Sequence, residues 1–571
     1  MARSFFIVTA WCFAALCILP IVALIVSASA GSWETWTSLA NTVLPGFAWT
    51  TLVLVFYVAV GTAVVGAVTA WLVTAYTFPG RRILEILLAL PLAFPAYVIA
   101  YAYTDLLDHP GAVQTALRSI MDWGPRDYWF PEIRSVGGAA LMLIFVLYPY
   151  VYLLTRAAFL RQSSTAFQAA RMLGHSSWSA FFRVSLPTAR PAIAGGVILA
   201  LMETVADFGT VAHFGVQTFA TGIYQAWISI GDRPAAAQLA FCLLQVALLL
   251  VVLERLERRA QRHYDIGRPA DVMQPVRLRG PQAIMALIAC ILPVLVGFVI
   301  PLIVLFEMAI GSGQSPFSRR YLAFAANSLT AAGIAALVTM VGAVAVGYLA
   351  RLVPGRIPIA LKAVAGMGYA IPGGVIAVSL LIPLAAFDNA VDAVMRDWFG
   401  ISTGLLLTGS IVLLVMAYTV RFMAVGLAAF DTGMSSINPA MDAAARTLGA
   451  RPGRMFLRVH LPLLRTGLLT GFLIVFVDVM KELPATLILR PFNFDTLAVQ
   501  AYRLASDERL AQAAVPSLVI VAFGLLPVII LCHSIVRSRS GEASRALSTA
   551  PAGATRAVAS QRRPLPGESV S

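Results

Sequence analysis

Long apolar stretches separated by short polar segments form the dominant pattern of this chain. A helix of about 20 apolar residues crosses the hydrocarbon core of a bilayer. Twelve stretches of that kind lie near residues 5–28, 48–77, 83–105, 137–158, 191–213, 236–253, 283–309, 325–350, 360–386, 404–426, 466–489 and 510–534. The pattern therefore predicts an all-α polytopic membrane protein with about 12 transmembrane helices.

Composition and charge support this class and indicate an orientation. Hydrophobic residues make up 59% of the 571 residues and charged residues only 12%, about half the charged share of a soluble globular chain. With the N-terminus inside, cytoplasmic segments hold 30 Lys and Arg residues and outer segments hold 10. The positive-inside rule then predicts cytoplasmic N- and C-termini. The net charge of +14 is explained by these loops, and no nucleic-acid partner is expected.

The first apolar stretch has some features of a signal peptide. Arg3 precedes it and the small residues 27–30 follow it, an order that also occurs at cleavage sites. We expect the stretch to be retained, because its removal would leave an odd number of helices and break the repeat described next.

The chain contains an internal repeat with one constant spacing. The segment Ala169–Gly174 matches Ala444–Gly449, and Arg183–Pro187 matches Arg458–Pro462. The interval from Gly174 to Gly449 is called the repeat spacing below. Repeats of this kind indicate duplicated structural units. The expected organisation is a first half at 1–253, a cytoplasmic linker at 254–282, a second half at 283–534 and a disordered basic cytoplasmic tail at 535–571.

Each repeat copy predicts a short helix, a bend and a new helix. Alanine-rich runs favour helix, Gly174 and Gly449 permit a bend, and Leu-Pro suits the first turn of the following helix. An ordinary loop helix lying flat on the membrane surface would have a similar composition. Two copies at one spacing, on one side of the membrane, argue against that alternative.

The repeated segments, at 168–188 and 443–463, resemble the EAA loop of ABC importer permeases. In that family the loop forms a coupling helix that docks on a cytoplasmic ATPase. The opening Glu of the family pattern is replaced here by Gln168 and Ala443, with Asp442 one place earlier. The resemblance assigns the coupling role to Gln168, Ala169, Ala170, Gly174, Leu186, Pro187, Ala443, Ala444, Ala445, Gly449, Leu461 and Pro462.

A wider resemblance covers most of the chain. Segments 206–210, 214–219 and 221–224 are similar to the first half of fused ferric-iron permeases, and segments 481–487, 489–492 and 495–498 to the second half. The resemblance implies a type I importer fold of two homologous six-helix halves in the bacterial inner membrane. It also implies two copies of a cytoplasmic ABC ATPase and an external iron-binding protein. Because the chain has no GxxxxGK[ST] motif, ATP and Mg would be bound by the partner ATPase, and the permease is expected to be neither an enzyme nor a cofactor protein.

Ionisable residues within the predicted spans are the candidates for a translocation path. Glu203 and Asp207 are matched at the repeat spacing by Asp478 and Glu482, and Lys481 lies beside the second pair. The i,i+4 spacing predicts that each pair occupies one helix face. Carboxylates suit a hard cation such as iron(III) bound transiently. A structural role is the alternative, with Lys481 neutralising Asp478 or Glu482.

Two further features have open interpretations. Pro91, Pro95 and Pro372 interrupt the third span of each half, and broken helices can mark moving or substrate-facing segments or have no such role. Tyrosines 97, 101 and 103 fit an aromatic belt at the outer interface better than iron ligation.

The most specific functional prediction is therefore an iron(III) importer permease. The same machinery could carry thiamine, a polyamine or a phosphonate. A secondary transporter of six plus six helices and a non-transporting membrane scaffold are alternatives from other classes.

Overall fold

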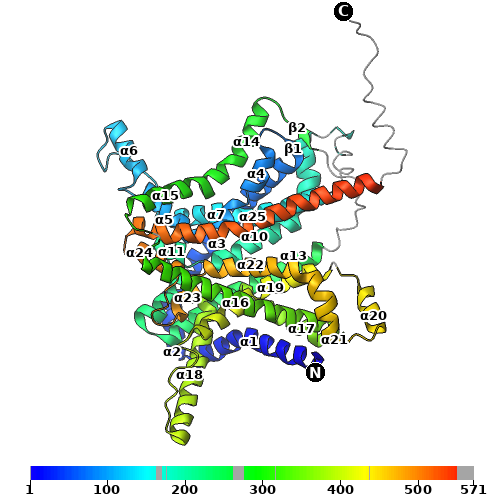
Figure 1. Cartoon of the computed structure of the whole chain (residues 1–571). Coiled ribbons are helices and arrows are strands. Elements are labelled where there is room, and N and C mark those ends of the chain that lie inside the picture. Colours follow the sequence, from blue (N-terminus) through cyan, green and yellow to red (C-terminus); the bar gives the residue numbers. More distant parts are fainter. Residues whose placement is uncertain are drawn as a thin grey trace, which may run out of the picture.

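The fold is a bundle of membrane-length helices (Figure 1). The structure, a computed structural model, describes residues 2–162, 170, 172–174, 176–261, 275–315, 317–435 and 437–549. Within these residues, 11 helices are long and apolar enough to cross a membrane, or 12 if the bent pair Arg81–Ala93 and Ala96–Met121 counts as one span. The predicted all-α polytopic fold is confirmed.

The elements follow the same order in the two halves. The helices that form the membrane-length spans, or parts of a broken span, are α1 (Ala2–Ala30), α3 (Leu44–Ala75), α4 (Arg81–Leu87), α5 (Ala96–Leu107), α7 (Val136–Arg161), α10 (Leu186–Ala206), α13 (Arg233–Gln261), α14 (Pro281–Val294), α15 (Ile300–Gly311), α16 (Arg319–Leu352), α17 (Arg356–Ala365), α18 (Gly373–Phe399), α19 (Ile411–Ser435), α22 (Leu461–Met480) and α25 (Leu510–Thr549). The shorter α-helices are α2 (Trp33–Asn41), α6 (Ala112–Met121), α9 (Ser177–Ala180), α11 (Gly209–His213), α12 (Phe219–Tyr224), α20 (Pro439–Thr447), α21 (Pro452–Met455), α23 (Pro484–Leu489) and α24 (Leu497–Ser506). The 3₁₀ turns are η1 (Leu90–Ala93) and η5 (Gly368–Ala370), and the π turns are η2 (Phe181–Ser185), η3 (Gln225–Ile230), η4 (Leu295–Val299) and η6 (Phe456–His460).

Two short strands join the first half to the segment between the halves. Strand β1 (Tyr76–Thr77) pairs in parallel with β2 (Val276–Arg277), with Tyr76 opposite Val276. In Figure 1 these strands lie at the same end of the bundle as the N-terminus and helices α20 and α21, whereas α6 lies at the opposite end. The repeat segment of the second half therefore shares one end with the N-terminus.

The first span of each half crosses over to the other half. Helix α1 packs against α16, α17 and α18, and α14 and α15 pack against α3, α4 and α5. The halves are therefore homologous along the sequence but interlocked in space. Neither half could bury its apolar faces in the same way alone.

Small residues allow the helices within each half to approach closely. A Cβ atom on Gly196 of α10 would lie 2.6 Å from Cα of Val151 on α7. The matching Gly471 of α22 would place a Cβ 2.5 Å from Cβ of Ala429 on α19. Such contacts replace the hydrophobic driving force that is missing between helices in lipid.

The third span of the first half is broken rather than continuous. The sequence predicted a span over 83–105 that is interrupted at Pro91 and Pro95, and the chain bends by 93° between α4 with η1 and α5 with α6. Pro95 precedes α5 in extended backbone, and Pro372 occupies the same place before α18. Proline lacks the N–H that would continue a helix, so the predicted interruption is confirmed at both sites.

An ion pair with reversed polarity joins corresponding helices in the two halves. In the first half, Arg156 on α7 contacts Glu85 on α4 at 2.8 Å. In the second half, Asp431 on α19 contacts Lys362 on α17 at 2.6 Å. Arg156 and Asp431 are separated by the repeat spacing, so the same connection is made with the charges exchanged.

The C-terminal region differs from the sequence prediction. The segment from 535 was predicted to be a disordered tail, but α25 continues to Thr549. Residues 550–571 lie outside the described residues. The polar composition of this segment did not predict a helix, because an apolar face was the signal used. A helix that extends beyond the bundle needs no such face.

Candidate functional site

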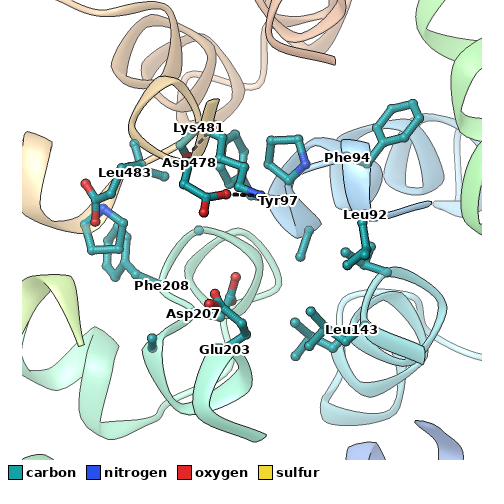
Figure 2. Close-up of a pocket in the computed structure, with 18 of the residues that line it drawn as sticks. Leu92, Phe94, Tyr97, Leu143, Glu203, Asp207, Phe208, Asp478, Lys481 and Leu483 are labelled. Carbon is teal, nitrogen blue, oxygen red and sulfur yellow. Dashed lines mark hydrogen bonds and ion pairs between the residues drawn. The ribbon is translucent and has the colours of Figure 1, made fainter. Parts of the chain in front are cut away.

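A cavity of about 120 Å³ lies between the two halves. Its walls come from α7 and α10 of the first half and from α19 and α22 of the second, together with residues next to the breaks in the third spans. The cavity is lined by all five of the residues predicted for the translocation path, namely Glu203, Asp207, Asp478, Lys481 and Glu482. In Figure 2, Glu203 and Asp207 lie across the cavity from Asp478 and Lys481.

Two of the four acids, Glu203 and Asp478, each contact another polar side chain that lines the cavity. The Tyr369 hydroxyl donates to Glu203 Oε1 at 2.7 Å. Lys481 Nζ lies 2.9 Å from Asp478 Oδ1. The lysine thus neutralises Asp478, as one of the two sequence interpretations proposed.

The other two acids cap short helices. Asp207 accepts hydrogen bonds from the backbone N–H groups of Thr210 and Val211, at 3.1 and 3.2 Å. Glu482 accepts from the N–H groups of Ala485 and Thr486, each at 3.2 Å. Both carboxylates therefore satisfy the free N–H groups at the start of α11 and α23.

This geometry corrects the predicted helix face. Helices α10 and α22 end at Ala206 and Met480, so Asp207 and Glu482 lie beyond the helix and do not share a helical face with Glu203 and Asp478. The capping bonds compete with continuation of the helix, because a carboxylate can replace the helical partners of these N–H groups. The chain turns, and the four acids still face one cavity.

The four acids do not form a metal centre in this conformation. Within the described part of the chain, no three His, Cys, Asp or Glu side chains are grouped closely enough to hold a metal ion. A transient metal site at Glu203, Asp207, Asp478 and Glu482 remains a prediction.

Substitutions at Asp207 should separate its charge from its capping role. Asparagine keeps an oxygen that can cap α11, so we expect Asp207→Asn to keep the unfolding temperature while lowering transport. Alanine removes the cap as well and should destabilise the protein by about 1 kcal/mol. Thermal unfolding and uptake measured on the same preparations test this. Full uptake by Asp207→Asn would show that capping is the only role of this carboxylate.

Three tyrosines were predicted to form an interfacial belt, and this interpretation is wrong. Tyr97, Tyr101 and Tyr103 are all buried, and Tyr97 lines the cavity. The break at Pro95 turns α5 into the bundle, so its tyrosines pack against protein instead of the membrane interface. The bend could not be placed from apolar length alone.

Arg421 is a cavity residue that the sequence interpretation missed. It lies near the end of the predicted span 404–426, and it was grouped with the arginines of the cytoplasmic segment that follows. Helix α19 instead runs to Ser435, and Arg421 is buried near its middle and lines the cavity. The next charged residue after Arg421 is Asp431, ten residues further along the chain. This position of Arg421 within an apolar stretch was the signal available in the sequence.

The glycine bends of the two repeat segments are confirmed. The φ angles of Gly174 and Gly449 are +86° and +74°, a region that other residues rarely adopt. In the second segment, Ala443, Ala444 and Ala445 lie in α20. Of the corresponding residues in the first segment, Ala170 is buried, whereas Gln168 and Ala169 lie outside the described residues.

Each Leu-Pro pair occupies the first turn of its α-helix, α10 or α22, as predicted, and each of these helices continues a helical segment that precedes it. The helical spans run over Phe181–Ala206 and Pro452–Met480, so they begin earlier than predicted. The π turns η2 and η6 directly precede Leu186-Pro187 and Leu461-Pro462. Proline cannot donate to the preceding turn, and the wider π turn accommodates it without ending the helix.

An exposed leucine precedes the glycine bend in each half. Leu173 is 79% exposed and Leu448 is 87% exposed, and the repeat spacing separates them. Exposed apolar side chains at equivalent tips suit a partner surface. Their matching position directly before the glycine of each copy was the signal available in the sequence.

A buried polar cluster anchors α20 to the bundle. His460 Nε2 lies 2.9 Å from Asp442 Oδ1, and Arg351 Nε donates to Asp442 Oδ2 at 2.9 Å. His460 Nδ1 lies 3.1 Å from the Tyr348 hydroxyl. His460 is fully buried in η6. The cluster connects α20 with α16 and with the start of the α22 span.

Comparison with known proteins shows the family. The family of binding-protein-dependent transport system inner membrane components matches residues 63–263 and 343–538, one match in each half. The chain belongs to this family and is a fused, two-half permease of the ABC importer class, a transport subunit that works with a separate ATPase and a substrate-binding protein. The secondary-transporter and scaffold alternatives are thereby set aside.

Similar relatives differ in the cargo that their names give. The chain is 25% identical to the Fe(3+)-transport system permease protein FbpB 2 of Haemophilus influenzae over 490 residues, which cover 84% of this chain and 88% of that protein. It is 28% identical to the sulfate transport system permease protein CysT of Escherichia coli over 240 residues, 41% of this chain and 84% of CysT. It is 29% identical to the molybdenum transport system permease protein ModB of Escherichia coli over 194 residues, 33% of this chain and 81% of ModB.

Proposed function

We propose that this chain forms the membrane pathway of an ATP-driven importer for iron(III). An external iron-binding protein delivers the cargo to one end of the bundle, and two copies of a cytoplasmic ABC ATPase bind the segments 168–188 and 443–463 at the other. The N- and C-termini then lie in the cytoplasm, and the halves correspond to 1–253 and 283–534.

One observation carries the proposal: the cavity between the halves brings together four carboxylates that recur at the repeat spacing. Glu203 and Asp207 enter it from the first half, and Asp478 and Glu482 enter it from the second. Oxygen ligands of this kind suit a hard cation. A relative that matches across both halves is named as an Fe(3+) permease, whereas the sulfate and molybdenum permeases match shorter parts of the chain.

The fold suggests how nucleotide binding moves the cargo. ATP binding draws the two ATPase copies together, and the bends at Gly174 and Gly449 transmit that motion to the helices that continue into α10 and α22. Those helices end at the acids of the cavity. A rigid-body shift of the halves would then change access from the outer to the inner side, with hydrolysis resetting it.

Iron uptake in reconstituted vesicles tests the proposal. Radiolabelled iron(III) should enter vesicles only when the permease, the ATPase, the binding protein and ATP are all present. Thiamine, putrescine, a phosphonate, sulfate and molybdate serve as competing cargoes. Uptake without the ATPase, or uptake of a competitor in place of iron, would refute the assignment.

A further inference from the structure

Arg421 is a buried guanidinium that lacks an ion-pair partner among the residues that the structure describes. The side chain lines the cavity and is 8% exposed. Its Nε and Nη1 atoms are buried and make no hydrogen bond to the described part of the chain. Two of the three guanidinium nitrogens are thus buried without a hydrogen-bonding partner, which is unfavourable for a charged group, so these two donors are available to a further group.

The acids of the cavity do not supply the missing partner. Asp478 is paired with Lys481, and the oxygens of Glu482 accept from backbone N–H groups at the start of α23. Glu482 is nonetheless close to Arg421, since a Cβ on Gly373 would clash with Glu482 Oε1 and lie 2.9 Å from Arg421 Nη1. The Glu482 oxygens are directed to the helix start, and the guanidinium edge is left for another group.

The basic side of the cavity comes from one half only. At the repeat spacing before Arg421 the first half has Val146, and before Lys481 it has Ala206. Both of these apolar residues also line the cavity. The acids are therefore repeated in both halves, whereas the two cations belong to the second half. A site for a bare cation would gain nothing from an added guanidinium at its edge.

We propose that Arg421 is a specificity-determining residue that binds an anionic oxygen group carried by the cargo, such as a carboxylate of an iron(III) chelate. This inference rests on the proposed iron-import function and specifies the form in which iron passes. A guanidinium presents parallel N–H donors that match a carboxylate or a comparable oxyanion. Glu203 and Asp207, which lie across the cavity from Asp478 and Lys481 (Figure 2), would face the metal.

The size of the cavity agrees with a compact complex. A volume of about 120 Å³ is below the roughly 300–1,000 Å³ of sites that hold drug-sized ligands. It therefore favours a compact cargo, such as a metal ion with a small chelator, over a larger organic one.

Ligand-induced stabilisation of the purified permease tests the role of Arg421. Ferric citrate should raise the unfolding temperature of the wild-type chain, because a ligand that binds only the folded state stabilises it. Citrate alone, sulfate and molybdate are the comparison probes. Arg421→Gln should lose the shift, and Arg421→Lys should keep part of it, since lysine retains the charge without the planar donor pair. Arg320→Gln, at an exposed arginine outside the cavity, should behave as wild type.

Uptake in the complete vesicle system separates this inference from the proposed function. Arg421→Gln should take up iron from ferric citrate at least about tenfold more slowly, the loss expected for one charge-assisted hydrogen bond. If it takes up iron at the wild-type rate and has the wild-type unfolding temperature without ligand, the role of Arg421 is refuted and iron import stands. If sulfate or molybdate gives the Arg421-dependent shift, iron import is refuted and the anion-binding role stands. A wild-type chain that none of the four probes stabilises refutes the anion-binding role.

Discussion

Replacing Leu173 and Leu448 together with aspartate should abolish transport while leaving the bundle folded. Both side chains are exposed at the tips of the repeat segments, so the isolated permease loses little packing. Each leucine buried in an ATPase groove contributes about 1.5–3 kcal/mol, and loss of both corresponds to at least about a hundredfold weaker association. Co-purification of the ATPase and ATP-dependent uptake measure the effect.

Matched variants identify the cause of that loss. The double substitution to methionine keeps apolar surface at both tips and should retain transport. Single aspartate variants should each give a partial defect, because each tip meets its own ATPase copy. Normal uptake by the double aspartate variant would show that the tips do not contact the ATPase.

Asp442→Ala should cause the largest loss of stability among single substitutions in α20. It removes the partner of both Arg351 and the fully buried His460. Breaking a buried charge pair from one side costs roughly 3–5 kcal/mol. We expect the lower part of that range, since the Arg351 side chain is 25% exposed. The unfolding temperature of the purified chain reports the loss.

The same cluster sets a dependence on pH. Burial raises the pKa of Asp442, but hydrogen bonds from Arg351 and His460 outweigh it and hold the pKa below its ordinary 3.8. A carboxyl with a lowered pKa in the folded state contributes stability above its unfolded pKa and loses it as pH falls through the folded value. This contribution should therefore be constant near neutral pH and disappear below about pH 4.

Comparison with Asp442→Asn tests both statements. The amide keeps the shape and one acceptor oxygen, so its destabilisation should be smaller than that of alanine. It cannot ionise, so the acid-dependent part of the stability should be absent. An unchanged acid profile in Asp442→Asn would mean that another group controls the loss.

The helices and the repeat could be predicted because each depends on a strong local signal. Twelve apolar stretches and one constant repeat spacing identify the spans and the two halves without any long-range contact. The bends at Gly174 and Gly449 follow similarly, since glycine is the residue best able to adopt the positive φ angles observed there.

The cavity could be predicted only in part. The five ionisable residues were found because charge is rare in membrane spans. The role of Asp207 and Glu482 as helix caps depends on where α10 and α22 end, and apolar length does not determine that point. Arg421 was missed for the same reason, because an error of a few residues in a helix end moves an arginine from the interface to the interior.

The exchanged polarity of the pairs Arg156–Glu85 and Lys362–Asp431 has a consequence for membrane insertion. Helices of similar character enter the bilayer in succession, and each half contains near copies of the helices of the other. Packing α4 on α19 would set Glu85 against Asp431, and packing α17 on α7 would set Lys362 against Arg156. Like charges facing each other are unfavourable, most strongly at the buried Arg156 and Glu85 side chains and less at the partly exposed Lys362 and Asp431. The reversal thus directs each newly inserted helix to its own neighbours, so a duplicated chain assembles without confusing its two copies.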